Sequence, residues 1–315
     1  MQLSSYCFPS SQVLARFPRS SESDRNAHSV MSVLRIDQAQ PAALPHVRIQ
    51  PAKGLLELDL AGLWAYRELI HILVWRDVMV RYKQTVLGVA WAMFQPVATM
   101  LIFTVVFSVM GKIPSDGFPY PVFLYAGLLP WFYISQALSR GGTSLVGEAP
   151  LISKVYFPRL ILPLSATIAP LVDLALAFIA FLGLMAWFGV VPSWRILLLP
   201  LFAGLGATMA FAAGLWVSAL YVRYRDVGHI LPMFIQLWMF VSPILYPVSK
   251  VPESWRTIYA LNPVVSVVEG FRWALIPGFE VDFSMFLPSL IIVAAALVGG
   301  LIYFRSMERT FADVI

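Results

Sequence analysis

Long apolar runs constrain the fold of this chain more than any other feature of its sequence. A helix needs roughly 20 apolar residues to cross the ~30 Å hydrocarbon core of a bilayer, and this chain contains several such runs. Its 315 residues are 59% hydrophobic and 12% charged, whereas an ordinary soluble domain is about 25% charged. A membrane β-barrel has alternating segments of only about 10 residues. The sequence therefore predicts an all-α polytopic membrane protein.

Six of the apolar runs are predicted to cross the membrane. The fourth carries Gly206, Ala210 and Gly214 at intervals of four, which gives it a small-residue face that another helix can approach closely. The predicted spans are residues 87–110, 120–138, 161–190, 196–222, 230–246 and 286–304, within a six-helix transmembrane domain at residues 87–309.

Residues 258–276, which precede the last span, are apolar but interrupted. Asn262 and Pro263 break the run, and Glu269 and Arg272 place two charges in it. A pair of re-entrant half-helices buried against protein accommodates such a segment at membrane depth. We therefore predict half-helices here.

The chain before the first span divides into two parts. Residues 1–54 are rich in Ser, Pro, Arg and Gln and are predicted to form a disordered cytoplasmic tail, in which Met31 is an alternative start. Residues 55–86 are too charged to span the membrane and are predicted to form an amphipathic helix on its surface, with Leu69, Leu73 and Val80 on the apolar side. A soluble helix is the alternative, which Trp64 and Trp75 disfavour because Trp prefers headgroup depth.

Basic residues predict the orientation of the chain. Lys and Arg gather before the first span, between the second and third, between the fourth and fifth, and after the sixth. The positive-inside rule then places both termini in the cytoplasm, with residues 310–315 as a short tail. This distribution accounts for the net charge of +5 without a nucleic-acid partner.

Residues 147–164 form a short basic island between two apolar runs. Pro150, Pro158 and Pro163 oppose a continuous helix, and Lys154 and Arg159 favour a water boundary. We predict a cytoplasmic turn on which a soluble partner acts. The predicted coupling residues are Glu148, Leu151, Lys154, Phe157 and Arg159.

No group of residues in the sequence points to catalysis or to a bound cofactor or metal. Cys7 is the single cysteine and the four histidines are scattered, so neither suggests a metal site. Residues 142–149 begin like a phosphate loop but have Glu148 and Ala149 where that loop needs Lys and Ser or Thr. Any dependence on ATP must therefore come from a partner. Asp173 lies in the third span, either as a buried structural acid or as part of a proton relay.

Aromatic residues are dense on the first, second and fifth spans. Their rings can stack on the C–H faces of sugars and so guide a glycan, although lipid-facing belts are the alternative. The candidates for such a substrate path are Trp91, Phe94, Trp131 and Trp238.

Five segments resemble the permease subunits of ATP-binding-cassette polysaccharide exporters, of the ABC-2 type. They are LGVAWAMFQPVATMLIFTVVF at 87–107, YAGLLPWFYIS at 125–135, PLISKVYFPRLILPL at 150–164, YRDVGHILPMFIQLWMFVSPILYP at 224–247 and LNPVVSVVEGFRWAL at 261–275. The resemblance covers about residues 60–309 in the same order. It implies a homodimer in the bacterial inner membrane that carries two cytoplasmic ATPase subunits, which bind the ATP and Mg, and exports a lipid-linked glycan such as O-antigen, capsule or teichoic acid.

The resemblance also implies roles for three segments. Residues 142–158 correspond to a coupling helix that enters a cleft of the ATPase, and residues 259–276 correspond to half-helices that shape the outer side. Residues 60–83 correspond to a gate helix at the cytoplasmic entrance. The gate residues implied on this helix are Arg67, His71, Arg76 and Arg81.

Two other functions remain open from the sequence. One is an exporter of the same architecture for drugs or small lipids, and the other is a proton-coupled secondary transporter that uses Asp173. An intramembrane glycosyltransferase is a third possibility, but no catalytic cluster supports it. The chain is therefore expected to be a permease subunit and not itself an enzyme.

Overall fold

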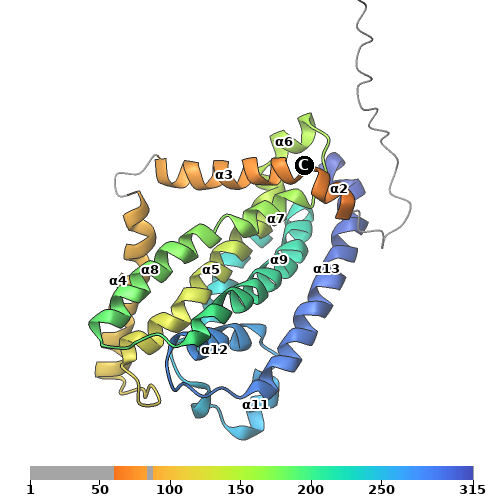
Figure 1. Cartoon of the computed structure of the whole chain (residues 1–315). Helices are drawn as coiled ribbons and strands as arrows, with labels where there is room; N and C mark the ends of the chain where they lie inside the picture. Colours follow the sequence, from red (N-terminus) through yellow and green to blue (C-terminus); the bar gives the residue numbers. More distant parts are fainter. Residues whose placement is uncertain (1–59, 84–87, 315) are drawn as a thin grey trace, which may run out of the picture. The chain divides into compact units, whose positions relative to one another are not determined.

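The computed structural model describes residues 60–83 and 88–314, which belong to one compact unit, Ala52–Ile315. The described residues are helical apart from their connecting loops (Figure 1). The predicted tail at 1–54 lies outside them. The predicted surface helix is represented by α2 (Leu60–Ala65) and α3 (Arg67–Lys83), with α3 lying across one end of the helix bundle.

Five helical segments of the described chain are long and apolar enough to cross a membrane. In chain order they are Val89–Met110 (α4, Val89–Phe103, continued by the π-helix η1, Thr104–Met110), Tyr120–Gly147 (α5), Ile161–Trp187 (α7, Ile161–Ile168, and α8, Leu171–Trp187), Trp194–Arg223 (η2, Trp194–Leu198, and α9, Leu199–Arg223) and Phe283–Glu308 (η4, Phe283–Met285, and most of α13, Phe286–Val314). The predicted span at 230–246 corresponds to α10 (Val227–Val241), whose 15 residues are fewer than a span needs. The sixth crossing therefore stays a prediction.

Helix α5 lies at the centre of the bundle and packs against α7, α8, α9 and α12. Its closest neighbour is α9, because a Cβ built on Gly214 of α9 would lie 3.6 Å from the Cα of Gly141. Gly206, Ala210 and Gly214 are all buried on α9. The predicted small-residue face is therefore confirmed.

Two helices extend beyond their predicted ends. Helix α5 continues to Gly147 instead of ending at residue 138, and α13 continues to Val314 through the predicted tail at 310–315. The segment predicted as a tail is helical as far as Val314, and its Phe311 is buried and packs edge-on against Phe304, with ring centroids 5.2 Å apart. The cytoplasmic location of this segment stays a prediction. This aromatic pair gives the last turns of α13 an apolar side to bury.

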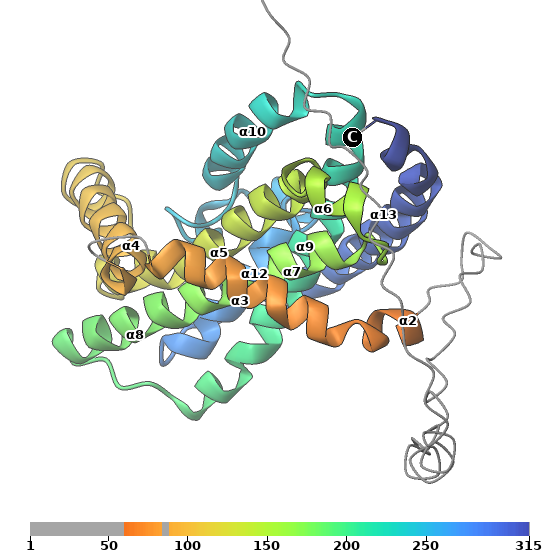
Figure 2. The same cartoon turned by 90° about the horizontal axis from the view of Figure 1, so that it is seen from above.

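The predicted turn at 147–164 is confirmed as a break in the helices. It consists of the short helix α6 (Ala149–Lys154) and a non-helical stretch that leads into α7. Pro150 lies in the first turn of α6, where its missing N–H costs nothing. Viewed from above, α3 crosses over α5 and α7 (Figure 2).

Helix α3 buries part of its predicted apolar side against the bundle, through Leu69 and Leu73. Leu73 and Val78 are buried, whereas Val80 is 59% exposed and Ile72 is 60% exposed. The apolar side was predicted to lie on the membrane, so the exposure of Val80 to the surroundings of the chain does not test that prediction. The location of α3 at the membrane surface stays a prediction.

The buried side chains form two main cores. The larger core joins α4, α5, α8, α9, α10 and α12. The smaller one lies where α3, the turn and the end of α13 meet, and we call it the α3-end core. Its buried members are Leu73, Leu145, Phe157, Leu160, Ile161, Leu162, Leu215, Ala219, Val222, Phe304 and Phe311.

The opposite end of the bundle contains η3 (Val248–Lys250), α11 (Glu253–Tyr259) and α12 (Pro263–Leu275). Helix α12 begins at Pro263 directly after its N-cap, Asn262, so the predicted break at this dipeptide is confirmed. The depth of these two helices in a membrane stays a prediction.

Candidate functional site

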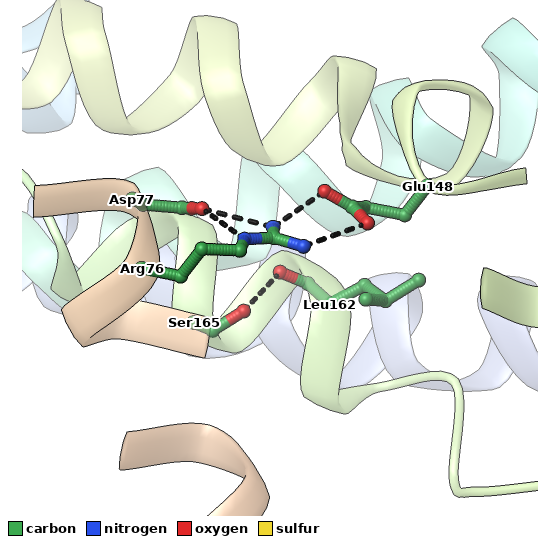
Figure 3. Close-up of polar contacts among 5 residues, drawn as sticks. All are labelled: Arg76, Asp77, Glu148, Leu162 and Ser165. Atoms are coloured by element: carbon green, nitrogen blue, oxygen red, sulfur yellow. Dashed lines mark hydrogen bonds and ion pairs between the residues drawn. The ribbon is translucent and has the colours of Figure 1, made fainter. Parts of the chain in front are cut away.

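The joint between α3 and the turn after α5 is held by the guanidinium of Arg76 (Figure 3). Arg76 Nη2 donates to Glu148 Oε1 at 2.5 Å and Nη1 donates to Oε2 at 3.1 Å, so the contact is bidentate. Asp77 accepts from Arg76 Nε at 3.1 Å and from Nη2 at 2.9 Å. Arg76 therefore lies between an acid of its own helix and one that is 72 residues further along the chain.

Glu148 lies where two helices meet, since it is the C-cap of α5 and the N-cap of α6. Its hydrogen bond with Arg76 raises the pKa of that guanidinium above the usual value. The two side chains are 42% and 29% exposed, and pairs this exposed contribute about 0–1 kcal/mol to stability. The contact therefore contributes little to stability, but it sets the position of the turn against α3 and links any movement of the turn to that helix.

The predicted coupling residues have unlike surroundings. Glu148 contacts α3, and Leu151 packs partly buried against the α3-end core. Phe157 is buried in that core, and Arg159 donates a hydrogen bond to the main-chain carbonyl of Glu308 in α13. Lys154 is exposed at the end of α6. Lys154 is therefore the member of this set that is most available to another protein.

Two neighbouring residues that sequence reasoning missed are also exposed. Val155 is 52% exposed and Tyr156 is 71% exposed. The next residue, Phe157, is buried. Nothing in the sequence indicated which of the two aromatic residues is buried.

Two of the four predicted gate residues form ion pairs with other parts of the chain, and the other two are exposed. Arg67 and His71 are exposed on α3, whereas Arg76 contacts Glu148. Arg81, near the other end of α3, forms an ion pair with Asp173 of α8 and donates to Gln136 Oε1 at 3.4 Å. Helix α3 is therefore fastened by one arginine to the turn and by another to the bundle.

Asp173 is buried and accepts a hydrogen bond from Tyr82 as well as its ion pair with Arg81. Around these groups is a cleft of about 130 Å³. Its lining includes Trp91, Gln95, Phe132, Tyr133 and Gln136. Aromatic rings beside amide and charged groups are able to bind a polar ring such as a sugar.

The four predicted path aromatics form two separate pairs. Trp91 stacks on Phe94 with ring centroids 5.6 Å apart, and both are more than half exposed. Trp131 is buried and meets Trp238 edge-on at 6.4 Å. Only Trp91 of the four borders the cleft beside Asp173. The role of all four in a substrate path stays a prediction.

Asn262 connects α10 to α12 at the opposite end of the bundle. Its Oδ1 accepts from Trp238 Nε1 at 3.0 Å and from the Val264 main-chain N–H at 3.2 Å. Its Nδ2 donates to Ser242 Oγ at 3.0 Å. Pro263 occupies the first turn of α12, where its fixed φ suits a helix start.

Arg272 of α12 is fully buried and contacts three segments. Its Nη1 lies 3.1 Å from Glu269 Oε1, and its Nη2 donates to the Ile244 carbonyl at 2.8 Å. The guanidinium also lies 3.7 Å from the ring centroid of Phe123 on α5. Gly127 leaves room for it, because a Cβ there would lie 2.9 Å from Nη2. Glu269 and Arg272 therefore hold this end of the bundle together.

Among the residues that the structure describes, no three His, Cys, Asp or Glu side chains are placed to hold a metal ion. Neither the joint at Arg76 nor the cleft at Asp173 has an arrangement of groups typical of catalysis. Both lie where α3 contacts the rest of the bundle. The chemistry of the site is thus that of ion pairs that can form and break.

Comparison with known proteins identifies similar chains. The family described as ABC-2 type transporter matches residues 68–276, from α3 to just beyond α12. The chain is 30% identical over 259 residues to the O-antigen export system permease protein RfbA of Myxococcus xanthus, covering 80% of this chain and 97% of that protein. It is 26% identical over 255 residues to the RfbA protein of Klebsiella pneumoniae, covering 79% and 95%. It is 24% identical over 233 residues to the polysialic acid transport protein KpsM of Escherichia coli, covering 70% and 85%.

Proposed function

The chain belongs to the ABC-2 type transporter family, and on that premise we propose that it forms the membrane channel of an ATP-driven exporter for a lipid-linked polysaccharide. The observation that carries this proposal is the Arg76–Glu148 contact, which joins a helix across the end of the bundle to an exposed turn. The relatives named for O-antigen and polysialic acid favour a polysaccharide as the substrate.

ATP hydrolysis belongs to a separate cytoplasmic subunit that binds ATP and Mg. That subunit contacts the turn at Lys154, Val155 and Tyr156, which line an open hollow of about 330 Å³ together with Phe157 and Arg159. When the ATPase subunits close, they displace the turn. The Arg76–Glu148 contact passes this displacement to α3, which opens the entrance for the glycan.

Six crossings and two cytoplasmic termini are part of the proposal. Leu73 of α3 and Phe311 of α13 share the α3-end core, so the described chain begins and ends at the same end of the bundle. A chain that returns to its starting side crosses an even number of times, whereas five segments have spanning length. Helix α10 with the residues after it supplies the sixth crossing.

A homodimer completes the channel. Helix α4 has only Pro96 and Met100 buried, and the following η1 has no buried residue. Helix α10 has only Leu231 buried. These apolar surfaces face either lipid or a second copy of the chain, and two copies enclose a path that includes Trp91 and Phe94. Crosslinking in native membranes, followed by a mass measurement, tests this assembly.

The transport function is tested with the purified complex in proteoliposomes. ATP inside the donor compartment is expected to move a lipid-linked glycan to the opposite leaflet, where an added glycosidase digests it. Deletion of the gene is expected to leave the cell surface without the glycan while the glycan accumulates inside. Glycan that still reaches the surface of the deletion strain overturns the proposal.

Charge reversal tests the partner contact. We expect Lys154→Glu to reduce the amount of co-purified ATPase about fivefold, because the new negative charge is repelled by the acidic groups of the partner that a lysine would face. Lys250→Glu is the matched control, since Lys250 is also an exposed lysine but lies in η3 at the opposite end. Equal losses in both variants, or none in either, contradict the placement of the ATPase at the turn.

A further inference from the structure

The last turns of α13 approach the turn that carries the exposed residues Lys154 and Tyr156. Phe311 is completely buried in the α3-end core, which it shares with Phe157 and Leu160 of the turn. Phe304, about two helical turns earlier, packs edge-on against Phe311. The C-terminal end of the described chain is therefore built into the same core as the turn.

Arg159 provides the polar contact between the turn and the last turns of α13. Its guanidinium donates to the main-chain carbonyl of Glu308 and lies 5.8 Å from the centroid of the Phe311 ring. A guanidinium near an aromatic ring adds a cation–π attraction. One side chain of the turn thus holds both the backbone and a ring of α13.

The Arg159 contact links the turn to a different helix from the one that the Arg76 contact reaches. Arg76 links the turn to α3, which lies across the end of the bundle. Arg159 links the turn to α13, which runs along the bundle to its opposite end and contacts α9 and α12. A displacement of the turn is therefore able to act on two helices at once, one at each of these links.

We propose that the end of α13 is a positioning element for the turn, with Phe311 and the Glu308 carbonyl clamping Arg159. The clamp transmits movement of the turn to the last transmembrane helix. The inference rests on the proposed transport function for its consequence, whereas the physical contact is independent of that function.

The test compares Phe311→Ala, Arg159→Gln and the double variant in the complex with its ATPase. Each single variant is expected to lower the glycan exported per ATP hydrolysed by about threefold to tenfold. The double variant is expected to match the worse single variant, because both substitutions remove the same contact. Arg159→Lys keeps a cation beside the Phe311 ring and is expected to recover part of the export that Arg159→Gln loses.

Val298→Ala is the matched control, because Val298 lies on the same helix but is 55% exposed. The melting temperature of the complex and the amount of bound ATPase separate positioning from a general loss of folding. Both are expected to stay unchanged in Val298→Ala, and export in Arg159→Gln is compared per bound ATPase. Single-variant effects that multiply in the double variant, or an equal loss in Val298→Ala, overturn the clamp.

Hydrogen exchange of residues 151–160 gives a second readout that needs no transport. Amide exchange there is expected to rise at least about fivefold in Phe311→Ala, because release of the clamp permits local opening. Unchanged exchange overturns the clamp even if export falls. Faster exchange in a protein that exports no glycan supports the clamp and refutes the proposed function instead.

Discussion

At Arg272, one buried guanidinium contacts Glu269, the Ile244 carbonyl and the Phe123 ring. We expect Arg272→Met to destabilise the protein by about 3–5 kcal/mol, because it leaves the Glu269 carboxylate buried without its partner. Adding Glu269→Leu is expected to recover part of the loss. Thermal melting in detergent measures both effects.

Arg256→Ala is the control for this prediction. Arg256 pairs with Glu253 at 3.8 Å, with side-chain exposures of 38% and 90%, so the pair contributes about 0–1 kcal/mol. A melting temperature that falls as far in Arg256→Ala as in Arg272→Met contradicts the special role of the buried arginine.

Asp173 fastens α3 through Arg81 and Tyr82, which argues against a proton carrier that must bind and release protons freely. We expect Asp173→Asn to lower stability by about 3 kcal/mol, since Arg81 then loses its charge partner. Adding Arg81→Gln is expected to recover part of that loss. Melting in detergent provides the measurement.

Transport assays on Asp173→Asn address the alternative function. ATP-driven export is expected to persist in this variant and to be insensitive to an uncoupler. Two results together support a secondary transporter instead. One is the loss of export in Asp173→Asn, and the other is transport by the unsubstituted chain that follows a proton gradient without ATP.

At the scale of elements, the contact between α3 and the turn is open to a charge-swap test. Arg76→Glu and Glu148→Arg are each expected to lower export per ATP by about twofold to tenfold, because each places like charges together. The double swap is expected to restore coupling, since it recreates the ion pair with reversed polarity. Export and ATPase rates in proteoliposomes give the ratio.

Arg67→Glu serves as the matched control on α3, because Arg67 is an exposed arginine of the same helix and has no ion pair with an acid among the described residues. High salt is expected to weaken coupling in the unsubstituted chain, as a half-exposed pair is screened. A double swap that remains as impaired as the single variants refutes the joint.

The elements themselves were largely predictable, whereas their contacts were not. Apolar runs of spanning length predicted the first, third and fourth spans and the starts of the second and last ones closely, because a bilayer imposes their length. Glu148 and Arg76 were each singled out, but a separation of 72 residues gives no local sign that they meet. Trp131 was expected to face a substrate and Phe157 a partner, but both are buried in the cores. Only the three-dimensional structure distinguishes them from the exposed Trp91 and Tyr156.

At the scale of the whole molecule, the proposed topology is testable with cysteines, because Cys7 is the single native one. In a Cys7→Ser background, Ser153→Cys lies in α6 and Glu253→Cys lies in α11 at the opposite end. A membrane-impermeant maleimide added outside intact inner membranes is expected to label only Glu253→Cys. Ser153→Cys is expected to react once the membrane is opened, and labelling of both positions from one side contradicts the six-crossing topology.

The α3-end core also determines when the chain can finish folding. Leu73 leaves the ribosome early, whereas Phe304 and Phe311, which complete the same core, are made more than about 200 residues later. Synthesis proceeds at about 5–20 residues per second, so this core stays open for many seconds after α3 emerges. Its closure therefore waits until the end of α13 has been made. If the proposed ATPase binds only the ordered turn, it will engage chains in which this core has closed and not those in which it is still open.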